Sequence, residues 1–317
     1  MNKLFLIRNP EMFQGKKYIN TNQEYFEGWY FKNTNNKNSI SFIPGINVNK
    51  DEKKAFVQVI TNDFSGCVNY SIDDFEFRFR PFFIRIGNNL FSKNDIHVDI
   101  KDDAQNLTVF GDIKYSGSEN IRTNFLNPNI MGPFSYVPFM ECNHAVLNMK
   151  TRADGLIYVN NDEMKFDNGI GYMEKDWGCS FPKSYIWCQG NNFQNSNASF
   201  MLSIADVPFK AFCFKGIICS LILNSTEFRF ATYNNAKLVR YDVNDDFFNI
   251  VLKQGAYYLD ISSKCITGLK LLAPVKGRMK KDIFESISAS ISVTLKNNKE
   301  VLFSDISTNC GLEIVKH

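Results

Sequence analysis

A short segment just past the middle of the chain combines acidic and aromatic side chains. Residues 171–178 read Gly-Tyr-Met-Glu-Lys-Asp-Trp-Gly. In an extended strand alternate side chains face the same side, so Glu174 and Asp176 lie together and Lys175 points the other way. A carboxylic acid buried among apolar side chains has a raised pKa and can donate a proton at neutral pH. The two acids therefore fit a proton donor and a group that holds it, and equally a structural ion pair with Lys175 or Arg152.

Three further titratable residues are candidates for the same chemistry. Glu27 shares strand parity with Tyr25 and Trp29, so it is either an acid of raised pKa or, as we favour, half of a buried ion pair. Glu141 and His144 are three residues apart and face opposite sides of a regular strand, so only a bulge or turn would bring them together. The chain has only three histidines, which argues against a His-rich metal site or a Ser-His-Asp triad. We expect no metal.

Strands must position these residues, because apolar and polar side chains alternate with period two along most of the chain. The alternation is clearest in residues 75–80, 96–100, 249–253 and 288–295. Asparagine-rich turn clusters separate such segments at 33–38, 87–89, 160–162 and 297–298. Short strands joined by close polar turns predict an all-β sandwich or barrel. A helix is expected only near residues 279–285.

The two halves of the chain match each other, which indicates a duplication. Trp29 and Trp187 are 158 residues apart, and the same offset relates Ser41, Phe42, Ile46, Phe56 and Ile60 to Ser199, Phe200, Ile204, Phe214 and Ile218. Glu141 and Ala145 match Glu285 and Ala289 at the shorter offset of 144. Loop deletions within a duplication produce such a falling offset. We expect two similar β-units, residues 1–165 and 166–317. In this alignment His144 has no acidic or basic counterpart, which makes it a better functional candidate than Glu141.

Composition limits the class of protein. With 317 residues, 44% hydrophobic and 22% charged, the chain can bury a large core. The net charge of +3 comes from interspersed signs, so no basic stripe indicates a nucleic-acid partner. Eight cysteines without a C-x-x-C pair are typical of reduced thiols. Neither a signal peptide nor an apolar run of 18 residues is recognisable, so we expect a cytoplasmic protein without a membrane span.

Several segments carry motifs that occur together, in order along the chain. They are 25–32 (YFEGWYFK), 41–45 (SFIPG), 55–60 (AFVQVI), 138–144 (PFMECNH), 171–178 with 181–182 and 187–189, 277–279 (GRM) and 285–287 (ESI). This series resembles the bacterial tocopherol cyclase-like family over nearly the whole chain. The resemblance implies two lipocalin-like β-barrels or sandwiches packed into one body, in agreement with the duplication. The wider superfamily includes carotenoid hydratases and lipocalin-like pericyclases.

The resemblance also implies a reaction. Plant and cyanobacterial members close the chromanol ring of vitamin E: an alkene of a prenylated hydroquinone is protonated, and a phenol oxygen captures the tertiary cation. Such an isomerase, an intramolecular lyase, needs no cofactor. Its partner would be a small apolar ligand, isoprenoid or lipid-like.

The site residues that this interpretation implies fall into two groups. The candidate acids are Glu174 and Asp176, followed by His144, Glu141 and Glu27. The candidate substrate-binding residues are Trp29, Tyr172, Trp177, Tyr185, Trp187 and Gln189. Two alternatives stay open, because fold does not fix function: a non-catalytic carrier of a lipid or isoprenoid, and a hydratase that adds water to an isoprenoid alkene.

Overall fold

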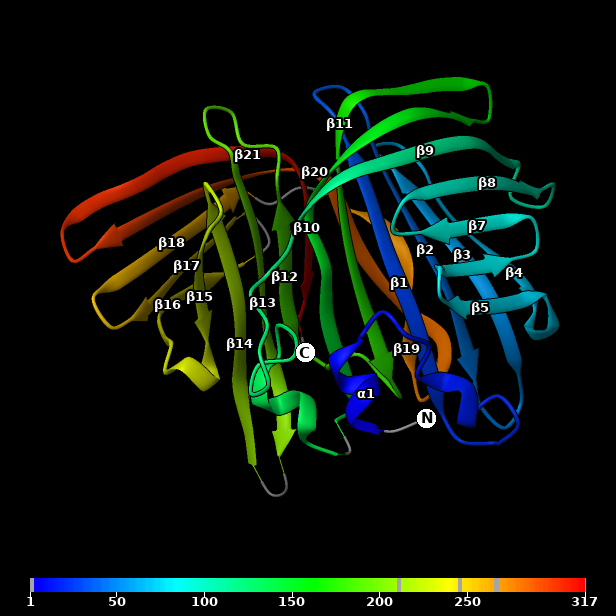
Figure 1. The fold of residues 1–317 in the computed structure, drawn as a ribbon, viewed down its shortest axis with the longest axis horizontal. Helices are drawn as coiled ribbons and strands as arrows, with labels where there is room; N and C mark the ends of the chain where they lie inside the picture. Colours follow the sequence, from blue (N-terminus) through cyan, green and yellow to red (C-terminus); the bar gives the residue numbers. More distant parts are fainter. Residues whose placement is uncertain (1–2, 139, 210–211, 245–246, 265–267, 317) are drawn as a thin grey trace.

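The protein folds almost entirely into antiparallel β-strands, as the computed structural model shows (Figure 1). The structure describes residues 3–138, 140–209, 212–244, 247–264 and 268–316. The predicted all-β fold of two related units in one body is confirmed. The two large sheets lie side by side, one built from the first half of the chain and the other from the second.

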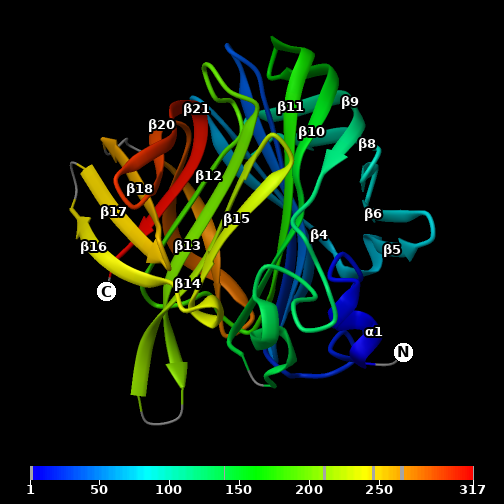
Figure 2. The ribbon, with the colours of Figure 1, turned by 60° about the vertical axis from the view of Figure 1, so that its left-hand side comes forward.

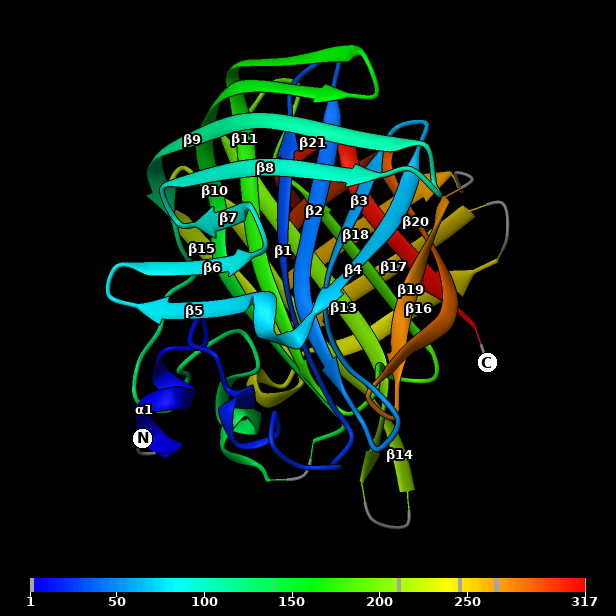
Figure 3. The same ribbon diagram turned by 90° about the vertical axis from the view of Figure 1, so that its right-hand side faces the viewer.

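The first sheet has the strand order β4-β3-β2-β1-β11-β10-β9-β8-β7-β6-β5 in the described residues. Figure 3 shows its long strands β8 and β9 running across the face of the molecule. Its strands are β1 (Tyr25–Thr34), β2 (Ser39–Val48), β3 (Lys53–Thr61), β4 (Ser65–Ser71), β5 (Phe75–Phe79), β6 (Phe82–Ile86), β7 (Asn89–Ser92), β8 (Asp95–Asp102), β9 (Leu107–Glu119), β10 (Cys142–Val159) and β11 (Asp162–Gly178).

The second sheet has the order β15-β14-β13-β12-β21-β20-β18-β17-β16, and β19 pairs with β20 outside this path. Figure 2 is turned so that this sheet, on the left in Figure 1, comes toward the viewer. Its strands are β12 (Tyr185–Gly190), β13 (Ala198–Phe209), β14 (Phe212–Leu223), β15 (Thr226–Ala231), β16 (Lys237–Val243), β17 (Phe247–Gln254), β18 (Tyr257–Lys264), β19 (Leu269–Val275), β20 (Arg278–Asn297) and β21 (Glu300–Val315).

Helices are few and short in the described residues. They are α1 (Lys3–Arg8) and the 3-10 turns η1 (Gly15–Lys17), η2 (Ile72–Asp74), η3 (Gly132–Tyr136) and η4 (Thr232–Asn234). The helix expected near residues 279–285 is wrong, because this segment is the start of β20 and pairs with β19. None of the described helices is long and apolar enough to cross a membrane. The described cysteines are free thiols, and Cys265 lies outside the described residues.

The order of strands repeats between the sheets. In each, the unit's first strand pairs with its second strand on one side and with its last strand on the other: β1 with β2 and β11, and β12 with β13 and β21. Residues 166–178, which the predicted boundary assigns to the second unit, belong to β11 and therefore to the first sheet. Divided by its sheets, the chain would separate between Gly178 and Tyr185.

The register between strands corrects the matching of the tryptophans. In the first unit Gly28 pairs with Gly45. The offset of 158 makes Ser203 the counterpart of Gly45 in the second unit, and Ser203 pairs with Trp187. Trp187 therefore takes the place of Gly28 and not that of Trp29. A slip of one residue exchanges the two faces of a strand, so the two indoles belong to different parts of the core.

Alternation along each strand divides the apolar side chains among three cores. One lies within the first unit and contains Trp29, and one lies within the second unit. A third lies between the sheets and contains Tyr30, Tyr172 and Trp187. One face of β1 and one face of β12 both contribute to this third core, and so do Ile121, Ile130 and Met131 from the connection between β9 and β10.

The hairpin β19–β20 joins the two units. Gln58 on β3 makes two hydrogen bonds with the backbone of Leu272. Its Nε2 donates to the Leu272 carbonyl at 3.1 Å, and its Oε1 accepts from the Leu272 N–H at 2.9 Å. Ser65 on β4 donates to the carbonyl of Lys270 at 2.7 Å. A strand of the second unit thus lies against an edge of the first, where it closes one side of the space between the sheets.

Candidate active site

A pocket with a cavity volume of about 190 Å³ lies between the two sheets. Strands of both units form its walls, and most of the lining side chains are apolar. The hairpin β19–β20 closes it with Leu271, Leu272 and Pro274, and the segment before β10 closes it with Met131 and Phe134. A largely apolar cavity with a few polar groups is the usual form of a small-molecule site.

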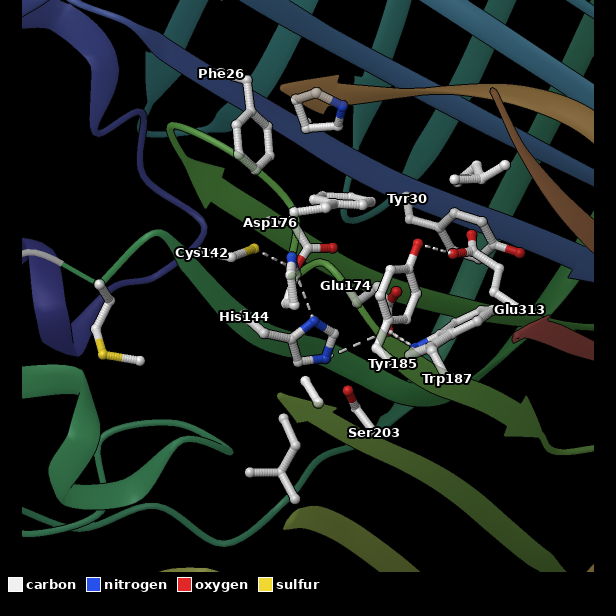
Figure 4. Close-up of a pocket in the computed structure, with 18 of the residues that line it drawn as sticks. Phe26, Tyr30, Cys142, His144, Glu174, Asp176, Tyr185, Trp187, Ser203 and Glu313 are labelled. Carbon is white, nitrogen blue, oxygen red and sulfur yellow. Dashed lines mark hydrogen bonds and ion pairs between the residues drawn. The ribbon is translucent and has the colours of Figure 1, made fainter. Parts of the chain in front are cut away.

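One cluster of polar side chains faces this pocket from β10 and β11 (Figure 4). His144 is the register partner of Asp176, and its Nδ1 lies 2.9 Å from Asp176 Oδ1. His144 Nε2 is 3.6 Å from Glu174 Oε2. That oxygen also accepts hydrogen bonds from the Tyr172 hydroxyl at 2.5 Å and from Trp187 Nε1 at 3.2 Å. Alternation along β11 thus places the two acids together, as expected, and β10 adds the histidine.

Burial and charge set the protonation of this cluster. Burial raises the pKa of Glu174 to about 7, against the opposing effect of the His144 charge. Burial lowers the pKa of His144, but Asp176 and Glu174 outweigh it and raise this pKa to about 9. At neutral pH the imidazole is therefore cationic, and the raised pKa lets Glu174 keep a proton that an exposed glutamic acid would have lost. An acid with a pKa near the working pH is well matched to proton transfer.

A second pair of acids lines the same pocket, and neither acid was a functional candidate on sequence grounds. Glu285 on β20 and Glu313 on β21 are register partners, and both are buried. The Tyr30 hydroxyl donates to Glu285 Oε1 at 2.5 Å, and the Tyr185 hydroxyl donates to Glu313 Oε2 at 2.6 Å. A usable signal was present, because Glu313 is a lone acid inside the apolar run Leu-Glu-Ile-Val.

The pair His144–Asp176 of the first unit and the pair Glu285–Glu313 of the second occupy equivalent positions. Gly28 pairs with Asp176, which pairs with His144. Its counterpart Trp187 pairs with Glu313, which pairs with Glu285. Glu285 is therefore the counterpart of His144, and not of Glu141 as the sequence offset suggested. The bulges in β10 and β20 make a constant offset unreliable there.

Glu27 lies on the face of β1 that points into the first core. Its Oε1 is 2.5 Å from Lys175 Nζ, with both side chains fully buried. The backbone N–H groups of residues 14–15 donate to Glu27, and Lys175 donates to the carbonyls of Pro10 and Met12 at 2.8 and 2.6 Å. This ion pair attaches the N-terminal segment to the sheet, which favours the structural interpretation of Glu27.

Of the remaining predicted residues, Tyr185 and Trp187 line the pocket. Trp29 and Trp177 instead flank Lys175, whose Nζ lies 4.7 and 4.8 Å from their ring centroids. They belong to the far side of the strands, as the parity of Lys175 requires.

Tyr172, Gln189 and Glu141 also lie outside the pocket lining, although Tyr172 donates to Glu174. Gln189 is buried where the sheets meet, with its Oε1 3.3 Å from Lys32 Nζ. The Glu141 side chain is exposed, while its backbone carbonyl accepts hydrogen bonds from Cys179 and Ser180. The geometry therefore brings together Glu174, Asp176 and His144, and leaves Glu141 and Glu27 apart.

His144, Glu174 and Asp176 could also offer one ligand atom each to a metal ion, since these atoms lie within 4.8 Å of one another. His144 Nδ1 already bonds to Asp176, and Glu174 Oε2 already accepts two hydrogen bonds. His144 Nε2 has no hydrogen-bond partner among the described residues, but the raised pKa of about 9 keeps a proton on the ring at neutral pH, and a protonated ring nitrogen has no lone pair for a cation. The donor set therefore fits proton transfer better than metal binding.

Comparison with known proteins agrees with this architecture. A sequence profile of the tocopherol cyclase-like family matches residues 122–315. The rice (Oryza sativa subsp. japonica) protein described as a probable chloroplastic tocopherol cyclase is 29% identical over 68 residues, which are 22% of this chain and only 14% of the rice protein. The chloroplastic tocopherol cyclase of maize (Zea mays) matches to the same extent.

Solved structures share the fold at low sequence identity. A candidate AttH protein from Nitrosomonas europaea has a TM-score of 0.54 at 9% identity, with 96% of this chain and 97% of that chain covered. CghA in complex with Sch210972 has a TM-score of 0.57 at 7% identity, with 92% and 88% covered. The profile match extends over more than half of the chain and includes both clusters of acids, and on this basis the protein belongs to the tocopherol cyclase-like family.

Proposed function

We propose that this protein is an acid-catalysed cyclase, an intramolecular lyase that acts on a prenylated hydroquinone or a similar isoprenoid. The observation that carries the proposal is a buried glutamic acid, Glu174, that accepts hydrogen bonds from Tyr172 and Trp187 in an apolar pocket with aromatic walls, where burial raises its pKa to about 7. Protonating an alkene requires an acid that keeps its proton at neutral pH, and burial supplies such an acid. The plant relatives are described as tocopherol cyclases, which supports this class of substrate.

Glu174 is the proposed proton donor. When its proton moves to the alkene, the carboxylate that remains is stabilised by hydrogen bonds from Tyr172 and Trp187 and by the nearby cation of His144. Asp176 holds the His144 ring through Nδ1 and favours its charged form. Each of these contacts is stronger when Glu174 is ionised, so they stabilise the product of proton transfer more than the starting acid.

The pocket walls suit the cation that follows. Tyr30, Tyr185 and Trp187 line the cavity, and the Tyr30 and Trp187 rings meet edge to face at 5.5 Å. Electron-rich ring faces stabilise a nearby cation. Apolar residues around them, among them Phe26 and Phe181, exclude water that would otherwise capture the cation before the ring closes.

The size of the pocket limits what it can enclose. A cavity of roughly 150 Å³ holds a benzene ring, so about 190 Å³ accommodates a reacting ring or alkene unit but not a whole prenyl chain. We infer that the reacting end lies beside Glu174 and that the remaining chain extends along the apolar side chains of Phe134, Val137 and Met140.

A hydratase is the second candidate, because His144 Nε2 is buried and has no hydrogen-bond partner among the described residues. A water molecule held there would be a nucleophile beside the same acid. A carrier is less favoured, since storage of an apolar ligand does not require a buried acid with a perturbed pKa.

The test is incubation of the purified protein with a geranyl-substituted hydroquinone in D2O, followed by chromatography and mass spectrometry. The expected product is the chromanol isomer with one non-exchangeable deuteron, and Glu174→Gln is expected to lower its rate about 100-fold or more. Glu141→Gln is the matched control, because this side chain is exposed. A deuterated alcohol would support the hydratase instead, and unchanged substrate that stays bound would support the carrier.

A further inference from the structure

Glu285 and Glu313 form a buried carboxyl pair that the proposed mechanism does not use. Glu285 is 1% exposed and Glu313 is 9% exposed, and both line the pocket. Tyr30 and Tyr185 each donate to one of the four carboxyl oxygens. Glu285 Oε2 has no donor among the described residues. An ionised carboxylate can only accept hydrogen bonds, so a buried oxygen without a donor indicates a missing proton or ligand group.

In the described part of the chain, the pocket lining offers no lysine or arginine to neutralise the pair, and the buried amine of Lys32 acts on Glu285 from outside the lining, with its own pKa lowered by burial to about 8. The lining contains four carboxyl groups and one histidine. The histidine already contacts Glu174 and Asp176. Two adjacent carboxylates cannot both ionise in an apolar site, so they share a proton. Burial and the neighbouring Glu313 raise the pKa of Glu285 well above its usual range, and burial raises that of Glu313 to about 7.

The contacts assign different forms to the two acids: a proton shared by the pair fits on Glu285 Oε2, the buried oxygen that has no donor among the described residues. Glu285 keeps its proton and can donate it to Glu313, which is poised to gain or lose a second one. A base is most effective when the pKa of its conjugate acid lies near the working pH. Glu313 therefore meets the requirement for a proton acceptor, and Glu285 meets that for the group that positions it.

The pair faces the His144–Glu174–Asp176 cluster across two aromatic rings. Trp187 donates to Glu174 through Nε1 and is itself the register partner of Glu313. Tyr30 is the register partner of Glu174 and donates to Glu285. A ligand held against these two rings therefore has Glu174 on one side and the carboxyl pair on the other; Figure 4 labels Glu174, Tyr30, Trp187 and Glu313.

We propose that Glu313, positioned by protonated Glu285, is the base that removes the hydroxyl proton when the ring closes. The inference rests on the proposed cyclase function. In this step the O–H bond of Glu174 breaks and its proton forms a C–H bond with the alkene π electrons. A lone pair of the substrate oxygen then forms the C–O bond, the O–H bond of the substrate breaks, and its proton goes to Glu313. The product is an isomer of the substrate, and solvent returns the proton from Glu313 to Glu174.

The experiment separates proton donation from ring closure. The geranyl-substituted hydroquinone is incubated in D2O with wild type, Glu174→Gln, Glu313→Gln and Glu285→Gln, and both chromanol formation and deuterium in the recovered substrate are measured. Glu313→Gln is expected to slow ring closure about 100-fold or more but to retain deuterium exchange, because the cation still forms and returns a proton from carbon. Glu174→Gln is expected to lose both.

Glu285→Gln tests the positioning role. A carboxamide has the shape of the protonated acid and can still donate to Glu313, so ring closure is expected within a few-fold of wild type. A purely structural role of the pair would slow ring closure in Glu285→Gln and Glu313→Gln alike. Thermal unfolding confirms that each variant is folded.

Three outcomes contradict the proposal. Ring closure at the wild-type rate in Glu313→Gln would mean that another group accepts the proton. Loss of both signals in folded Glu313→Gln, with exchange retained in Glu174→Gln, would assign the donor role to the carboxyl pair. If wild type itself shows neither exchange nor closure, the proposed function fails and this inference fails with it.

Discussion

Replacing His144 with glutamine tests whether Glu174 donates the proton and how its acidity is set. The imidazolium lowers the pKa of Glu174, whereas the Asp176 carboxylate raises it. Glutamine removes the cation and leaves Asp176 without its partner. Both changes disfavour the ionised form of Glu174, so its pKa rises. An acid that must be protonated to act loses activity above its pKa, and the variant should therefore keep its maximal rate to higher pH than wild type.

The expected size of the shift follows from the contact distance. At the 3.6 Å that separates His144 Nε2 from Glu174 Oε2, Coulomb's law with an effective dielectric constant near 20 gives about 4–5 kcal/mol. Water that enters the space left by the ring will reduce this energy. If a third remains, the change is about 1.4 kcal/mol, which corresponds to about one pH unit.

The assay is the pH dependence of chromanol formation between about pH 5 and 9. For wild type we expect a bell-shaped profile: the rate falls below about pH 7 as Glu313, the proposed proton acceptor, becomes protonated, and it falls tenfold per pH unit above about 7, the pKa of Glu174. For His144→Gln we expect a lower rate with the high-pH limb displaced upward by about one unit, and for Glu141→Gln the wild-type profile. A wild-type high-pH limb near pH 9, the pKa of His144, would assign proton donation to the histidine. A high-pH limb that moves downward or stays in place in His144→Gln would refute the electrostatic argument.

Three further predictions follow from the same contacts. Burial raises the pKa of Glu313 in the folded protein to about 7, from the usual value of 4.5. Between these two pH values the folded protein binds a proton that the unfolded chain has lost, so stability falls as the pH rises. Glu313→Gln should therefore flatten the fall of Tm between about pH 5 and 7. Trp187→Phe should remove most fluorescence quenching by the geranyl-substituted hydroquinone, whereas Trp29→Phe, in the first core, should retain it. Lys175→Met should lower the free energy of unfolding by about 3–5 kcal/mol in urea denaturation, because it leaves the buried Glu27 carboxylate without its cation.

Local patterns were sufficient to predict part of the fold and part of the site. Period-two alternation is a property of each strand by itself, so it predicted the all-β fold and the shared face of Glu174 and Asp176. It also predicted that Lys175 points the other way, which the contact with Glu27 confirms.

Properties that depend on pairing between distant strands were not predictable in this way. The contact of His144 with Asp176 requires the register of β10 with β11, and the Glu285–Glu313 pair requires that of β20 with β21. The matched tryptophans suggested one alignment of the units, but the sheet uses another that is shifted by one residue in β12. The segment expected to form a helix at residues 279–285 is the start of β20, and its pairing with β19 could not be predicted from that segment alone.

The duplication accounts for why the pocket holds two kinds of carboxyl group. In each unit the last two strands place one polar residue opposite an acid. In the first unit His144 on β10 lies opposite Asp176 on β11, and in the second Glu285 on β20 lies opposite Glu313 on β21. Where the partner is histidine, a cation neutralises the acid and Glu174 beside it can lose its proton at modest cost. Where the partner is a second glutamate, a proton must be retained instead. Burying four carboxyl groups against an apolar cavity costs free energy whenever the pocket is empty, and a pocket that only stored an apolar ligand would gain nothing in return. A donor on one side and an acceptor on the other are useful to a reaction in which the substrate gains a proton at carbon and loses one at oxygen.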